Sequence, residues 1–208
     1  MQNYAILLDA GFAKRKLGSR RSPAGVEGFS KLIEAIKNSV ELSGMTLHRI
    51  YYYDSVPLDT THEKPLSGGI IKYAESPLAI HAKSLFENLS KYPFVALRLG
   101  ELSFNGWQVK STKLKSSKSS SLEITHEDLE PNIKQKGVDM RIGMDIAALT
   151  LKKQVQTIVL VSADSDFVPA MKFARREGAN LFLVTLGHKV KNSMLEHSDL
   201  LLKIDIST

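Results

Sequence analysis

The sequence predicts an α/β fold with a mostly parallel central sheet and helices on both faces. Three apolar runs, Ala5–Leu8, Ile158–Val161 and Leu181–Val184, are strand-sized and uninterrupted, as in strands that are covered on both sides. Between these runs lie segments with apolar residues spaced by three or four, which indicates amphipathic helices. This order of strands and helices is typical of parallel sheets. The 208 residues are enough for one domain, which we expect to span 1–208.

The first elements are expected to be a strand, a basic segment and a helix. Tyr4–Leu8 is apolar throughout and is followed by Asp9. Residues 14–21 then hold five basic side chains and no acidic one. Ser22 followed by Pro23 predicts a helix N-cap with proline in the first turn. The helix after it would present one apolar face, formed by Val26, Phe29, Ile33, Ile36 and Val40.

The middle of the chain predicts strands around a long loop. Leu47–Tyr53 is rich in aromatic side chains, which favours a strand, and Asp54 follows it. Residues 55–76 contain prolines and a glycine pair without a hydrophobic period, so they predict a long loop. A helix is expected from Pro77. Residues 94–99 and 101–109 predict two further strands that form a small antiparallel appendage.

The last third is expected to alternate helices with buried strands. Residues 110–121 are basic and serine-rich with almost nothing to bury, which predicts a disordered loop. A helix should then run to about Lys152, and another should cover 167–177, with Pro169 in its first turn and Gly178 just past its end. The buried strands are Thr157–Val161 and Leu181–Val184, and a short helix near 190–197 completes the domain.

The composition excludes several kinds of site. Cysteine is absent, which rules out disulfides, thiolate zinc sites, iron–sulfur clusters and a cysteine nucleophile. The six histidines show no metal-ligand spacing, and no apolar run is long enough to span a membrane. Because the N-terminus also lacks a signal-peptide pattern, we expect a cytoplasmic protein that does not contact membranes. The net charge of +6 is concentrated in 14–21 and 110–118, which carry +5 and +4, so the rest of the chain sums to −3.

Acidic side chains recur where the predicted strands end. Asp9, Asp164 and Asp166 follow two of these strands, and ligands of parallel sheets bind at that edge. Asp139 starts a helix and Asp145 lies further along it, about 120° away. Carboxylates this close repel one another unless a hard cation neutralises them, which indicates Mg²⁺ or Mn²⁺.

Each of these residues also has a structural interpretation. For Asp9 and Asp164 we favour the functional role, whereas for Asp54 we favour a turn. Capping of the next helix is as good an interpretation of Asp166 as metal binding. A supporting role is favoured for Asp145 over direct ligation.

Two blocks of the sequence resemble a known family. Gln135–Asp145 (QKGVDMRIGMD) and Val161–Pro169 (VSADSDFVP) are similar to the signature blocks of the NYN domain family, which belongs to the PIN-like nuclease superfamily. Ile6–Asp9 resembles the first strand of that family, and several segments resemble its LabA-like bacterial branch. The resemblance covers about residues 3–198. It implies a PIN-like three-layer α/β/α fold.

The resemblance also implies a metal-dependent nuclease site. By position, Asp9, Asp139 and Asp164 match the acidic residues of the family site, with Asp166 and Asp145 as further acidic positions. One position departs from the pattern, because Phe12 stands where many NYN members have Asn.

The leading hypothesis is therefore a Mg²⁺- or Mn²⁺-dependent ribonuclease, with single-stranded DNA as an alternative substrate. Phosphate contacts are expected from basic and polar side chains near the acidic edge, namely Lys14, Arg15, Lys16, Lys136, Arg141 and Ser162. Phe12 supports a second hypothesis, an RNA-binding or regulatory module that has lost catalysis. A third hypothesis, a small-molecule phosphohydrolase, uses the same acidic edge but does not need the basic segments.

Overall fold

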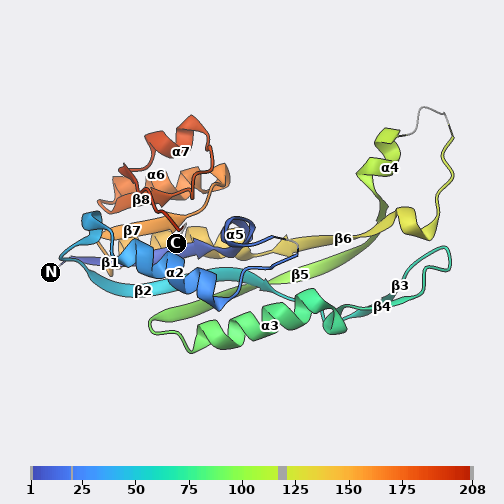
Figure 1. Ribbon diagram of the computed structural model, residues 1–208. Coiled ribbons are helices and arrows are strands. Elements are labelled where there is room, and N and C mark those ends of the chain that lie inside the picture. The colour runs from blue at the N-terminus through green and yellow to red at the C-terminus, as the bar shows by residue number, and fades with distance from the viewer. Residues whose placement is uncertain (1, 20, 117–120, 207–208) are drawn as a thin grey trace. The chain divides into compact units, whose positions relative to one another are not determined.

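The structure is a computed structural model that describes residues 2–19, 21–116 and 121–206 (Figure 1). The chain forms two compact units. The core unit contains Met1–Asp54, Leu85–Gly100 and Gly137–Thr208, and the ribbon unit contains Ser55–Ser84 and Glu101–Lys136. Among the described residues, no helix has both the length and the apolar character needed to cross a membrane.

The central sheet has the strand order β6-β5-β2-β1-β7-β8-β9. Its neighbouring strands from β2 to β9 are all parallel, which confirms the prediction of a mostly parallel sheet. These strands are β1 (Asn3–Asp9), β2 (Thr46–Val56), β7 (Thr157–Val161), β8 (Asn180–Val184) and β9 (Leu200–Leu201). Every residue of β7 is buried, as its uninterrupted apolar run predicts.

Helices cover both faces of this sheet. Two adjacent tyrosines of β2 point to opposite faces and contact different sets of helices. Tyr53 belongs to a core cluster with residues of α5 (Val138–Leu151), α6 (Val168–Arg176) and α7 (Asn192–Glu196). Tyr52 points to the opposite face and packs edge-to-face on Phe29 of α2 (Val26–Lys37) and Phe86 of α3 (Pro77–Ser90). The core unit is therefore a three-layer α/β/α arrangement.

In the first 45 residues, one helix was not predicted and two local expectations are wrong. The unpredicted helix is α1 (Ala10–Leu17), which carries the first basic residues. Phe12 and Ala13 are buried on one side of it, whereas Arg15 and Lys16 are exposed. Gly25, not Ser22, precedes the first residue of α2. The helix ends at Lys37, and Val40, 79% exposed, lies in the short 3₁₀ helix η1 (Val40–Leu42).

The ribbon unit confirms the antiparallel appendage but contradicts its details. Strand β5 (Val95–Val109) is one continuous strand and pairs antiparallel with β6 (Leu129–Lys136), which the sequence did not predict. The segment 55–76 is not a loop throughout, because β3 (Thr61–Glu63) and β4 (Ile70–Lys72) form a hairpin, followed by η2 (Tyr73–Glu75). Aromatic packing accounts for this order, since His62 stacks on Phe104 with 3.8 Å between ring centroids.

Part of the segment predicted to be disordered is helical. Residues Ser111–Ser116 form α4, and Lys113 pairs with Asp128 of η3 (His126–Asp128) at 2.9 Å. Residues 117–120, also in that prediction, lie outside the described residues.

Candidate functional site

Asp9 and Asp164 are joined through Ser162 at the carboxyl ends of β1 and β7. The Ser162 hydroxyl donates to Asp9 Oδ2 at 2.8 Å, and the Asp164 backbone N–H donates to Ser162 Oγ at 3.1 Å. Ser162 is fully buried, so it positions these two acidic residues and has no surface to offer a substrate. The pairing of β1 with β7, which sets Leu8 opposite Val161, brings the three residues together.

Both carboxylates also cap the helix that follows them. Asp9 Oδ1 accepts the Phe12 N–H at 3.1 Å at the start of α1. Asp164 Oδ1 accepts the Asp166 N–H at 2.9 Å at the start of the 3₁₀ helix η4 (Ser165–Phe167). This cap is formed by Asp164, and Asp166, for which capping and metal binding were equally good interpretations, contributes its backbone N–H to it. Hydrogen bonds at these caps fix the direction of the two carboxylates.

Asp139 belongs electrostatically to the same cluster. It lies in the first turn of α5, a helix that contacts η4. Partial burial raises the pKa of the Asp139 carboxyl, and the charges of Asp164, Asp9 and Asp166 raise it further. Burial also raises the pKa of Asp9, against the lowering effect of its hydrogen bonds with Ser162 and Phe12. The acidic cluster, Asp9, Asp139, Asp164 and Asp166, thus concentrates mutually repelling negative charge.

A hard divalent cation fits the chemistry of this donor set. All its ligands would be carboxylate oxygens, which Mg²⁺ and Mn²⁺ prefer. In the described part of the chain, no three histidine, aspartate or glutamate side chains lie together in an arrangement that could hold a metal ion. The capped carboxylates retain free lone pairs. A cation would offset the repulsion that, after burial, contributes to the raised pKa values of Asp9 and Asp139.

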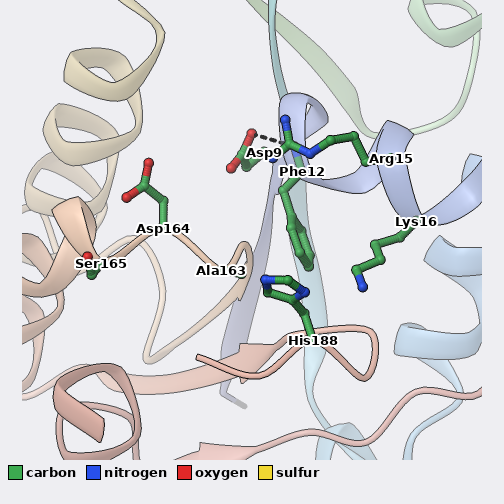
Figure 2. A pocket seen from close by; sticks show the side chains of 8 residues that line it. All are labelled: Asp9, Phe12, Arg15, Lys16, Ala163, Asp164, Ser165 and His188. Atoms are coloured by element: carbon green, nitrogen blue, oxygen red, sulfur yellow. Dashed lines mark hydrogen bonds between the residues drawn. The ribbon is translucent and has the colours of Figure 1, made fainter. Parts of the chain in front are cut away.

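An open cleft of about 440 Å³ lies beside the acidic cluster. Figure 2 shows Asp9 and Asp164 on one side of it, with Arg15 close to Asp9 and Lys16 pointing toward His188. Six residues were predicted to contact substrate, and two of them, Arg15 and Lys16, line this cleft. Both are exposed. Positive charge here would attract a phosphate that the carboxylates alone would repel.

Asp145 is engaged elsewhere. Its carboxylate accepts two hydrogen bonds from the Arg98 guanidinium, at 2.6 and 2.7 Å, and one from the Tyr53 hydroxyl at 2.9 Å. The Asp145 side chain is 11% exposed. These contacts do not bring Asp145 into the acidic cluster, and the supporting role that the sequence favoured over direct ligation stays a prediction.

The other predicted contact residues also lie outside the cleft lining. Lys14 forms an ion pair with Asp54, which accepts from the Tyr52 hydroxyl as well, and Asp54 lies inside β2 where a turn was expected. The Arg141 guanidinium donates to the carbonyl of Gly137 at 2.9 Å. Lys136, at the end of β6, is exposed in the ribbon unit.

Three cleft or cleft-edge residues were missed by sequence reasoning. Ser165 and His188 line the cleft, and Lys191 donates to Ser165 Oγ at 2.9 Å. His188 and Lys191 follow β8, and the rule that selected Asp9 and Asp164, position after a parallel strand, could have pointed to them.

Comparison with solved structures supports the fold. A crystal structure of a protein of unknown function from Vibrio parahaemolyticus superposes with a TM-score of 0.52, covering 98% of this chain and 93% of that one. The two chains are 12% identical, so the similarity concerns the fold alone.

Sequence comparison adds one relative and a family. An uncharacterized protein of Methanocaldococcus jannaschii is 25% identical over 81 residues, which are 39% of this chain and 34% of that protein. The matching segment thus spans about a third of the curated relative. The family model of the NYN domain matches residues 21–202, including Asp139 and Asp164 but not Asp9. The chain therefore belongs to the NYN domain family, a PIN-like nuclease family.

Proposed function

We propose that this protein is a metal-dependent ribonuclease of the LabA-like branch, hydrolysing RNA phosphodiester bonds at the acidic cluster. The observation that carries the proposal is the Ser162-bridged pair of Asp9 and Asp164, with Asp139 close enough to share their charge. Membership of a PIN-like nuclease family and the cationic residues beside the cluster support the same function.

In this proposal the residues divide between the metal and the RNA. Asp9, Asp139 and Asp164 hold Mg²⁺ or Mn²⁺, with Asp166 beside them. A bound ion would supply the Lewis acidity that lowers the pKa of an attacking water and stabilises charge on the phosphate. Arg15 and Lys16 bind phosphate groups in the cleft, and Ser162 keeps Asp9 and Asp164 in fixed orientations.

Phe12 supports a second candidate function, RNA binding without catalysis. It stands where many NYN members carry a polar Asn, and it is 4% exposed. Its ring packs edge-to-face on His188, with 6.0 Å between ring centroids. The position therefore offers no polar group to a metal-bound water or to substrate.

Cleavage assays separate the two candidates. Purified protein is incubated with single-stranded RNA, structured RNA and single-stranded DNA, with Mg²⁺, Mn²⁺ or EDTA. We expect metal-dependent RNA cleavage that falls at least about 100-fold in Asp9→Asn and Asp164→Asn, because Asn keeps the helix cap but loses the ligand charge. Asp59→Asn, an exposed carboxylate in the ribbon unit, is the matched control.

The other outcomes are equally informative. RNA that is bound but left intact, with affinity unchanged in Asp164→Asn, would support the binding module. Protein that neither binds nor cleaves any of these nucleic acids contradicts both candidates.

A further inference from the structure

A tight loop between β8 and α7 carries His188 onto the wall of the cleft. The His188 imidazole lies against the Phe12 ring at an interplanar angle of 64°, and both line the cleft that contains Asp9 and Asp164 (Figure 2). His188 itself is exposed whereas Phe12 is buried. The imidazole is thus supported from behind and accessible from the cleft.

The loop is built to hold this position. Leu186 and Gly187 adopt left-handed backbone conformations, with φ of 46° and 72°, and the His188 N–H donates to the Thr185 carbonyl at 2.8 Å. For Leu186 this conformation costs on the order of 1 kcal/mol, which the surrounding contacts must offset. At the far end of the loop, Lys191 is tied to Ser165, next to Asp164. The loop therefore begins at the carboxyl end of β8 and is tied to the functional edge at Lys191.

We propose that His188, supported by Phe12, is a nucleobase-stacking subsite of this cleft. The inference rests on the proposed function, because it assigns the part of an RNA strand that the cleft accepts. A base would stack on the imidazole while Arg15 and Lys16, which line the same cleft, bind phosphates of the same strand. Stacking of this kind is sequence-tolerant, because every base has a π face.

The subsite selects unpaired nucleotides. Bases inside a duplex are already stacked on their neighbours, and exposing one costs a few kcal/mol. The substrate class is therefore single-stranded RNA, or a loop of a folded RNA, with weak preference among bases.

The test compares oligonucleotides with and without bases. Fluorescence anisotropy measures the binding of a labelled uridine hexamer and of a hexamer of abasic nucleotides with the same phosphates. The full chain is used in buffer containing Ca²⁺ in place of Mg²⁺. The variants are His188→Ala and His188→Phe, with Lys189→Ala, an exposed neighbour, as control.

We expect His188→Ala to weaken binding of the uridine hexamer by roughly 5- to 150-fold, the range for one base stacked on an aromatic ring. His188→Phe should retain most of the affinity, Lys189→Ala should show a smaller loss, and the abasic hexamer should not distinguish His188→Ala from wild type. Because His188 is exposed, all variants should unfold at nearly the same temperature.

Two results would overturn the subsite. An equal loss on both hexamers would make His188 a phosphate contact, and unchanged binding in His188→Ala would remove it from recognition. Either result can coexist with metal-dependent cleavage, so the proposed function would survive. A wild-type protein that binds neither hexamer and cleaves no RNA would instead contradict the proposed function itself.

Discussion

Asp9 and Asp164 each cap a helix and also line the cleft. One oxygen of each accepts a backbone N–H at the start of the next helix. The structural and functional interpretations of an aspartate at a strand end are therefore not exclusive here. Capping holds the carboxylate at the cleft edge, and the remaining lone pairs stay available for a cation.

At the residue scale, Asp139→Asn should stabilise the protein when divalent cations are absent. The folded protein raises the Asp139 pKa through burial and neighbouring carboxylates, so ionisation of this group disfavours folding. The penalty is absent below the ordinary aspartate pKa of about 3.9 and develops as the pH rises through the raised pKa. Thermal unfolding in EDTA should show equal Tm values for wild type and variant near pH 3.5 and a higher Tm for the variant at pH 7.

Adding Mg²⁺ should reverse the order at pH 7. The ion stabilises the folded wild type by about 2.7 kcal/mol at a concentration of 100 times Kd, and the variant by less. A wild type that is at least as stable as Asp139→Asn in EDTA at pH 7 contradicts the repulsion argument.

Asp145 should prove important for stability and dispensable for chemistry. Removing a buried ion-pair partner typically costs 3–5 kcal/mol. Because the Arg98 side chain is 43% exposed, we expect Asp145→Ala to cost about 2 kcal/mol in urea unfolding. Tyr53→Phe, which removes one hydrogen bond to Asp145, should cost about 1 kcal/mol. Asp145→Asn should retain cleavage below its Tm. If it is folded and as inactive as Asp164→Asn, Asp145 is a metal ligand after all.

At the scale of elements, the site is assembled where each strand or turn passes into a helix. Asp9 joins β1 to α1, Asp164 joins β7 to η4, and Gly137 precedes the first residue of α5. Gly137 has φ of +78°, which glycine adopts without the steric cost that other residues meet. Asp139 follows two residues later, so we expect this turn to position it.

Gly137→Ala should therefore affect both stability and cleavage. The left-handed backbone costs about 1–2 kcal/mol for alanine, and the added Cβ would lie 2.6 Å from Arg141 Nη1, displacing that side chain. Gly44→Ala is the matched control, because Gly44 has φ of +77° and no atom within 4 Å of the new Cβ. Both should lose similar stability in urea unfolding, and Gly137→Ala alone should lower the cleavage rate. Equal cleavage rates in the two variants would show that this turn does not position Asp139.

At the scale of the whole molecule, the surplus of positive charge is local. The two basic segments carry +9 together, whereas the rest of the chain carries −3. Part of this charge is neutralised internally, since Lys14 pairs with Asp54 and Lys113 with Asp128. Arg15 and Lys16 face the cleft.

The salt dependence of RNA binding should show that the basic residues facing the cleft contact phosphate, whereas basic residues elsewhere do not. Each phosphate contact contributes about 0.7 to the slope of log K against log salt for a single strand. Arg15→Ala and Lys16→Ala should each reduce the slope by about that amount, whereas Lys83→Ala, an exposed lysine of the ribbon unit, should not. Titrations of labelled RNA at several salt concentrations give the slopes. If all three variants change the slope equally, RNA binding depends on the overall charge of the protein and not on this cleft.

Local pattern by itself determined the alternation of buried strands and helices, the mostly parallel sheet and the acidic residues at its edge. These features follow from hydrophobic periodicity and from where strands end, both of which lie within a few neighbouring residues. The ligand roles of Asp9, Asp139 and Asp164 stay predictions. The hairpin within 55–76, the continuous β5 and its partner β6 depend on pairing and aromatic packing between distant segments, which no local pattern encodes.

Only the tertiary structure decided what each polar side chain contacts. Asp145 pairs with Arg98, 47 residues away, and Ser162 bridges to Asp9, 153 residues away. His188 reaches Phe12 because β8 lies next to β7 and β7 next to β1. Strand order and register determine which of these distant residues come into contact. The sequence shows the residues but not that they are in contact.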